Sequence, residues 1–257
     1  MRVSVIILSS LLFLVFAVIS GQDQTRVPVY QEGEKLTYQI YYGPLNGGKV
    51  QMTLEPAYFN GKKVLHATAI GYTTGLANRV FRIYDVYQSY MDPDTGLPLK
   101  AIRDISEGNY RYYNEVLYDR DSSTVDSKLS GINEVPAGIL DMVSVIYKLR
   151  DTMQTVSLIE NDILEFNTYF SDKVYPVVVR YGNPETVKTR MGKFNALKLY
   201  PASDPGRVFK SDDDITVWLS DDNNFVPVRV RLNMLVGSVR MDLIEAEGLR
   251  YQLEKIE

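Results

Sequence analysis

The feature that most constrains the fold is an alternation of apolar and polar residues with period two, which returns in segment after segment of the chain. Successive side chains of a β-strand point to opposite faces, so this pattern predicts strands with one apolar face. The apolar side of the first such segment carries Leu36, Tyr38, Ile40 and Tyr42. The segment 36–42 is therefore expected to be a strand that covers a hydrophobic core.

A second alternating segment follows the turn-rich residues 43–48 and carries Val50, Met52 and Leu54 on one side. The two segments together predict a β-hairpin. Asn60-Gly61 provides the next turn, because both residues tolerate the positive φ of a tight turn. Further strands, each bounded by Gly, Pro, Asn or Asp, are expected at 64–73, 82–91, 99–106, 110–119, 124–129, 163–170, 174–180, 185–190, 194–201, 215–220, 226–232 and 238–247.

One segment near the middle of the chain breaks this alternation. Within residues 139–150, one helical face carries Ile139, Met142, Val143, Ile146 and Leu149. Apolar residues at this spacing are typical of a helix that packs against a core. The sequence therefore predicts one mostly buried helix within a series of strands.

The same segment carries polar side chains three residues apart, at Asp141, Ser144, Tyr147 and Arg150. Asp141 near the helix start and Arg150 at its end complement the helix dipole, each by about 0.3–1 kcal/mol. Two interpretations remain open. The helix is either a lid that gates a ligand, or an element that satisfies its buried polar atoms by hydrogen bonds to the surrounding strands.

The chain of 257 residues is long enough for one large β domain, and no linker rich in Pro, Gly or Ser divides it. Segments 90–100 and 218–229 resemble each other, either because of an ancient duplication or because hairpins commonly use the same pattern of turn residues. Both interpretations give meandering antiparallel strands. The expected fold is mainly β: a large antiparallel open β-barrel or strongly curved sheet with one central helix, in a single domain over residues 22–257.

Residues 1–21 have the pattern of a secretory signal peptide. Met1-Arg2 is positively charged, residues 3–19 are mostly apolar, and Ser20-Gly21 are small. A single membrane anchor is the alternative interpretation. Because the chain has no Cys, it has no disulfide, no thiolate nucleophile and no cysteine for lipid attachment. We expect an exported, periplasmic protein whose membrane contact is at most peripheral.

Composition and motifs give little support for catalysis. The 28 basic and 32 acidic residues leave a net charge of −4, which argues against nucleic-acid binding. His66 is the sole histidine and lies within an expected strand, where a structural role is the commoner one. The sequence holds no Gly-x-Ser-x-Gly elbow and no Gly-rich phosphate loop. We predict no catalytic residue, no metal ligand and no cofactor.

Carboxylates cluster at two places. Asp92 and Asp94 superficially suggest a calcium loop, but the later ligands of such a loop are missing, so a hairpin turn is favoured. Residues 212–214 and 221–224 are rich in Asp and Asn and are interpreted as solvated loops. A pair of carboxylates for glycoside hydrolysis depends on spatial separation, which the sequence does not give.

Several short segments together resemble a known family. They are 33–38, 42–43, 84–85, 141–150, 191–194, 217–221 and 226–227. Their order is similar to that of the exported family called domain of unknown function 3108, over about residues 30–247. The resemblance implies an exported bacterial protein without an established activity.

A second resemblance is more distant. The pattern of strand, Asp/Asn turn, Pro and strand is similar to that of the lipoprotein localisation factors. That resemblance implies an unclosed β-barrel around a hydrophobic cavity, with inserted helices as a lid. The long N-terminal helix of that family has no counterpart here.

Tyrosine is unusually frequent, with 19 among the residues of this chain. Tyrosine favours strands, but its amphipathic ring also suits a wall that binds a ligand with an apolar body and polar edges. The candidate ligand-binding residues are Leu36, Tyr38, Ile40, Tyr42, Val50, Met52, Leu54, Met142, Ile146 and Tyr147.

The leading hypothesis for function is a non-enzymatic envelope protein. Its concave sheet would bind a lipid-like or other apolar molecule. One alternative is a structural or assembly protein that pairs with envelope proteins. A less favoured one is an enzyme that acts on glycans.

Overall fold

The computed structural model describes residues 27–202, 214–234 and 237–257. Within these ranges the chain forms fifteen strands and two short helices. They are β1 (Glu34–Tyr42), β2 (Leu45–Phe59), β3 (Lys62–Thr73), α1 (Gly75–Val80), β4 (Tyr84–Met91), β5 (Pro98–Glu107), β6 (Tyr110–Asp119), β7 (Thr124–Ser127), β8 (Gly131–Glu134), α2 (Ser144–Met153), β9 (Ile163–Phe170), β10 (Lys173–Tyr181), β11 (Glu185–Thr189), β12 (Gly192–Ala202), β13 (Ile215–Ser220), β14 (Pro227–Asn233) and β15 (Ser238–Glu247).

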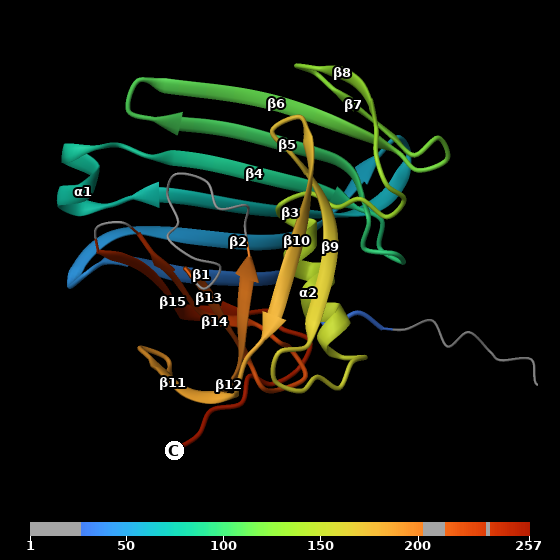
Figure 1. Ribbon diagram of the computed structural model, residues 1–257. Helices are drawn as coiled ribbons and strands as arrows, with labels where there is room; N and C mark the ends of the chain where they lie inside the picture. The colour runs from blue at the N-terminus through green and yellow to red at the C-terminus, as the bar shows by residue number, and fades with distance from the viewer. Residues whose placement is uncertain (1–26, 203–213, 235–236) are drawn as a thin grey trace, which may run out of the picture.

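All fifteen strands belong to one antiparallel sheet, which curls around α2 (Figure 1). Its order is β8-β7-β6-β5-β4-β3-β2-β1-β15-β14-β13-β12-β10-β9, and β11 pairs only with β12. The first and last strands, β1 and β15, are neighbours in the middle of the sheet. The path ends at β8 and β9 without a ladder between them, so the sheet is not closed. This confirms the expected mainly β fold.

The period-two pattern of β1 explains how the core forms. Leu36 and Tyr38 are fully buried and belong to the main hydrophobic cluster. Leu243 of β15 lies opposite Tyr38 in the ladder, and Val143 and Tyr147 beside and within α2 join the same cluster. Each such side chain contributes about 1.5–3 kcal/mol by leaving water. The core therefore lies between the concave face of the sheet and α2.

The helix starts later than the sequence predicts, at Ser144 rather than residue 139. The Asp141 carboxylate accepts hydrogen bonds from the backbone N–H groups of Val143 (2.7 Å) and Ser144 (2.9 Å). In return, the Ser144 hydroxyl accepts one from the Asp141 N–H at 2.8 Å. This reciprocal capping box fixes the helix start, because Asp141 cannot satisfy these amides from inside the helix.

The two similar hairpins predicted from sequence also share a structural irregularity. The β4–β5 ladder shifts register after Tyr90, and Met91 pairs with Pro98. The β13–β14 ladder shifts after Trp218, and Leu219 pairs with Pro227. The Asn60-Gly61 turn is confirmed, with φ of 50° and 76°. Helix α1 and strand β8 were not predicted.

Some expectations fall outside the described residues. The predicted signal peptide, residues 1–21, and Asp212 and Asp213 are among them. Within the described part of the chain, neither helix has the length and apolar character needed to cross a membrane. Asp92 forms a turn, because one of its carboxylate oxygens accepts hydrogen bonds from the backbone N–H groups of Asp94 and Thr95.

Candidate functional site

The concave side of the sheet holds an apolar cavity of about 350 Å³ between α2 and strands β1, β2, β9, β10 and β12–β15. Its wall on the C-terminal strands includes Val217, Leu219, Val230 and Met241. Among the described lining residues, only Tyr38 carries an O–H or N–H group in its side chain. The cavity therefore offers a hydrocarbon surface with one hydroxyl in its lining.

The register of the sheet explains why these side chains meet. Val217 of β13 lies opposite Val230 of β14, which in turn lies opposite Met241 of β15. Residues directly opposite one another in an antiparallel ladder share a face, so the three side chains form one apolar row. From the helix side, Val145 and Leu149 complete the wall.

Four of the ten sequence-predicted residues line this cavity: Tyr38, Met52, Met142 and Ile146. The other six do not. Leu36, Leu54 and Tyr147 are buried in the solid core. Ile40 and Val50 are partly buried elsewhere along the sheet, and Tyr42, at the end of β1, is exposed. Tyr147 belongs to the same buried cluster as Leu36 and Leu54, and its ring meets that of Tyr30 edge-on, with 5.0 Å between centroids.

Sequence reasoning missed the larger part of the wall. It comes from the second half of the chain, where Phe166, Val177, Val179 and Ile215 lie beside the row described above. Alternation in segments 163–170, 174–180 and 215–220 was the available signal. Most tyrosines, 13 of the 19, precede residue 139, whereas most of the cavity wall follows it.

A buried ion pair attaches α2 to β1. The Arg150 Nη1 and Nη2 atoms donate to the two carboxylate oxygens of Glu34 at 2.5 and 2.8 Å, and each side chain is only 1% exposed. Arg150 Nε also donates to the backbone carbonyl of Asn224 at 3.1 Å. Burial acts to lower the pKa of Arg150, but the Glu34 carboxylate more than offsets it, so the pKa is raised and the guanidinium stays charged.

Two buried tyrosines lie next to this pair. Burial raises the pKa of Tyr38 and of Tyr147, so both hydroxyls stay protonated. The Tyr147 ring lies under the Arg150 guanidinium, with 5.5 Å between Cζ and the ring centroid. Within the described residues, the Tyr38 hydroxyl has no hydrogen-bond partner.

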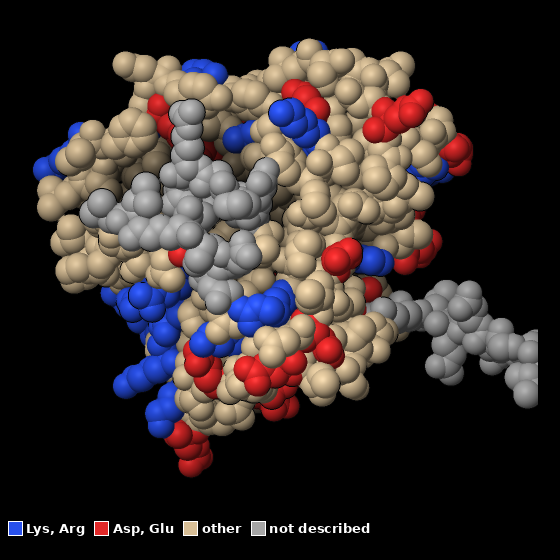
Figure 2. Space-filling model, in the orientation of Figure 1, with Lys and Arg blue, Asp and Glu red and all other residues tan. Residues whose placement is uncertain are grey.

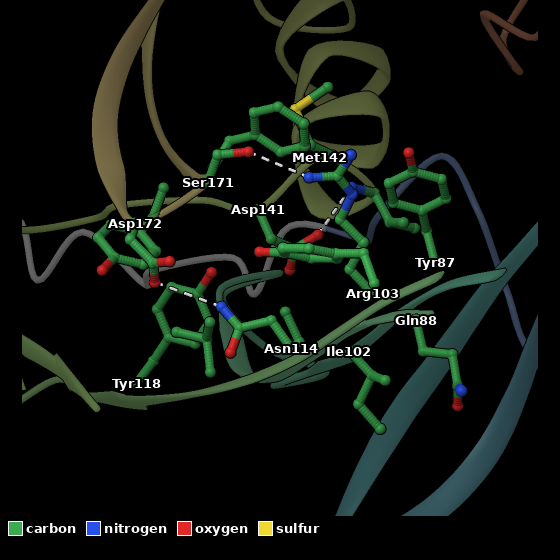
Figure 3. Close-up of a pocket in the computed structure, with 16 residues that line it drawn as sticks. Tyr87, Gln88, Ile102, Arg103, Asn114, Tyr118, Asp141, Met142, Ser171 and Asp172 are labelled. Atoms are coloured by element: carbon green, nitrogen blue, oxygen red, sulfur yellow. Dashed lines mark hydrogen bonds between the residues drawn. The ribbon is translucent and has the colours of Figure 1, made fainter. Parts of the chain in front are cut away.

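The open side of the sheet is joined by side chains rather than by a ladder. Ser171 and Asp172 form the tip of the β9–β10 hairpin, where both have positive φ. Arg103 Nη1 of β5 donates to the Ser171 hydroxyl at 3.0 Å, and Asn114 Nδ2 of β6 donates to Asp172 at 3.3 Å (Figure 3). The hydroxyls of Ser127 and Ser130 donate to the same Asp172 oxygen. We call these contacts of Ser171 and Asp172 the side-chain seam.

Aromatic rings hold Arg103 in place at the seam. Its Cζ lies 4.4 Å from the ring centroid of Phe170, 4.7 Å from Tyr112 and 5.7 Å from Tyr87. The space that remains is a cavity of only about 50 Å³, and Met142 lines both this cavity and the large apolar one. The seam therefore borders the apolar cavity but has little room for a ligand of its own.

Polar groups on the helix segment bond to strands, as one of the two interpretations expects. The Ser89 hydroxyl of β4 donates to Asp141 at 2.5 Å, and Arg150 pairs with Glu34 of β1. Burial raises the pKa of Asp141, and the hydrogen bonds from Ser89 and the two backbone amides act against this rise. These hydrogen bonds give Asp141 a structural role.

His66 is also held structurally. Its Nε2 lies 2.8 Å from Gln88 Oε1, and its ring stacks on Tyr90 with 4.2 Å between centroids. Across the described ranges, no cluster of three or more His, Asp or Glu side chains is placed to hold a metal ion.

Comparison with solved structures agrees with the open, curved sheet. The crystal structure of a beta-barrel-like protein of domain of unknown function DUF1849 from Brucella abortus is similar, with a TM-score of 0.53 and 8% sequence identity. The match covers 85% of this chain and 98% of that chain, and it shows a shared fold. No curated protein matches the sequence. The model of the family described as "Protein of unknown function (DUF3108)" matches residues 37–244, and the chain therefore belongs to that family.

Proposed function

We propose that this protein is an exported, non-enzymatic protein of the cell envelope that binds a lipid-like or other apolar molecule inside its curved sheet. The observation that carries the proposal is the cavity of about 350 Å³, whose lining is apolar apart from Tyr38. Small-molecule sites commonly have volumes of about 300–1,000 Å³ and mainly apolar walls. The cavity has the size and chemistry of such a site.

Burial of an apolar chain in this cavity would supply the driving force for binding. Transfer of about eight methylene groups from water into the cavity, at about 0.8 kcal/mol each, gives roughly 6 kcal/mol before the cost of association. Met142 and Met241 add adaptable side chains to the wall, which suits a flexible chain better than a rigid ring. An acyl or alkyl chain is the ligand class that fits best.

A fluorescent fatty acid tests the proposal directly. Wild-type protein is expected to bind it with saturation, and native mass spectrometry of gently purified protein is expected to show a bound apolar molecule. Val217→Phe fills part of the cavity and is expected to weaken binding at least tenfold. Val80→Phe makes the same chemical change on α1, where Val80 is 86% exposed, and is expected to leave binding unchanged.

Other outcomes would redirect the interpretation. Equal binding of the fatty acid by both variants would show that the cavity is not its binding site. Crosslinking in intact cells that gives one dominant protein partner, with no bound lipid, would support an assembly role instead. Strand β8 favours that alternative, because it lies at an edge of the sheet with one side unpaired, and its Ile132 is 75% exposed.

A further inference from the structure

The convex face of the C-terminal strands carries a second pocket, on the opposite side of the sheet from the apolar cavity. It has a volume of about 380 Å³, and three arginines line it: Arg229, Arg231 and Arg240. Figure 2 shows Lys and Arg side chains gathered at the lower left of the molecule, over the region of β11, β14 and β15 in Figure 1.

The charge of this pocket is opposite to that of the whole chain. Its charged lining residues are the three arginines and Glu185, which gives 3 − 1 = +2, whereas the chain has a net charge of −4. Glu185 already accepts hydrogen bonds from Trp218 Nε1 and from Lys198 Nζ. Its negative charge is thus partly neutralised on its own side of the pocket.

The register of β14 and β15 places two of the arginines directly opposite each other. Arg231 pairs with Arg240 in the ladder, and like charges in this position are destabilising. Asp242 is the nearby carboxylate, but Arg229 binds both of its oxygens, at 2.6 and 2.9 Å. Arg240 shares one of these oxygens at 3.3 Å. Among the described residues, no carboxylate forms an ion pair with Arg231.

Arg240 is also held in position. Its Cζ lies 4.6 Å from the ring centroid of Tyr41, on the neighbouring strand β1. A guanidinium that is stacked on a ring loses little freedom when it binds a ligand, and the planar arrangement of its donors matches phosphate oxygens. Arg231, which has no ion pair among the described residues, and Arg240, which only shares the Asp242 oxygen already bound by Arg229, thus lie opposite each other at the pocket.

We propose that this pocket binds a phosphate group through Arg231 and Arg240, with Arg229 beside them. An anion bound by these two paired arginines would offset their like-charge repulsion by charge-assisted contacts. The phosphate belongs either to a small soluble molecule or to a lipid headgroup. The site lies on the other face of the sheet and does not depend on the proposed apolar ligand.

Calorimetric titration with inorganic phosphate at low ionic strength is the first test. Wild-type protein is expected to bind it, and Arg231→Gln is expected to weaken binding about tenfold. Arg111→Gln is the matched control, because exposed Arg111 lies on β6 and donates only to backbone carbonyls of Gly108 and Tyr110 among the described residues. Phosphate binding that Arg231→Gln leaves unchanged would overturn the proposal.

Cosedimentation with vesicles distinguishes the two sources of phosphate. Vesicles of phosphatidylcholine with phosphatidylglycerol are compared with vesicles of phosphatidylcholine alone. Binding to the anionic vesicles that Arg231→Gln reduces supports a lipid headgroup, and binding of inorganic phosphate alone supports a soluble ligand. Binding to neither probe would overturn the proposal. Val217→Phe is expected to keep the phosphate response, which separates this site from the apolar cavity.

Thermal stability gives an independent measurement. Arg231→Glu replaces a like-charge pair by an opposite-charge pair with Arg240, so the variant is expected to have a higher Tm and no phosphate response. A lower Tm than wild type would contradict the repulsion on which the proposal is built.

Discussion

The Glu34–Arg150 pair offers the sharpest test of the energetics. Glu34→Met removes the partner of a guanidinium that is 1% exposed and leaves its two donors, now at 2.5 and 2.8 Å from carboxylate oxygens, without acceptors. Removal of one partner of a buried pair costs about 3–5 kcal/mol. Arg150→Met should cost a similar amount, because it leaves the Glu34 carboxylate buried alone.

The double variant, Glu34→Met with Arg150→Met, is expected to lose much less free energy of unfolding than the two single variants added together. With both charges gone, the main remaining defect is the Asn224 carbonyl, which loses the bond from Arg150 Nε at 3.1 Å. An unsatisfied buried carbonyl costs about 1–3 kcal/mol. The double variant should therefore lose about 1–3 kcal/mol, against about 6–10 kcal/mol for the two single losses added together.

Urea unfolding, followed by the fluorescence of the single tryptophan, Trp218, measures these differences. Glu247→Met is the control, because its pair with Lys35 spans 3.7 Å and both side chains are largely exposed. It should have little effect. A loss below about 1 kcal/mol for Glu34→Met, or a double variant as unstable as the sum, would refute the reasoning.

Three further predictions concern single positions. Burial raises the pKa of Asp141 above its ordinary value of 3.8. The protonated form therefore adds to the stability of the folded protein. This contribution is fully present below pH 3.8 and is lost as the pH rises through the folded-state pKa. Asp141→Asn does not titrate, so its free energy of unfolding should improve relative to wild type between about pH 3 and pH 7; a constant difference would contradict this. Asp172→Ala removes the acceptor of three seam hydrogen bonds and should cost about 1–3 kcal/mol, with faster hydrogen exchange confined to the β9–β10 tip. Global loss of protection would show that the seam is not a local structure. Gly248→Ala should lower the Tm clearly, because a Cβ there would lie 2.0 Å from the Gly33 carbonyl oxygen. Gly131→Ala is its control, with positive φ but open space; equal losses would mean that the close contact is unimportant.

The strands were predictable because local rules determine them. Alternation marks each strand, and turn residues mark its ends, as at Asn60-Gly61. The bulged hairpins that end at Pro98 and Pro227 share the same sequence grammar and the same register shift. Local pattern and global fold agree at these places, which is typical of sequences with a well-defined native state.

The cavity was predictable only in part, because its position depends on contacts between distant segments. The alternation in β1 shows which face is apolar but not where α2 packs on it. The Glu34–Arg150 pair helps to fix the position of α2, and these two residues are 116 positions apart in the sequence. The seam joins Asp172 to Asn114 and Ser127, and nothing in the local sequence of these residues indicates such a contact. The start of α2 could have been found, since Asp141 and Ser144 have the spacing of a capping box.

The place of β1 between β2 and β15 has a consequence for biosynthesis. A nascent chain can pair β1 to β8 early, but one long edge of β1 stays open until Ser238–Glu247 has been made. Pairings between such distant segments form slowly, and an open edge attracts strands of other molecules. Newly made protein should therefore depend on a holding chaperone that shields this edge, whereas the finished molecule should not.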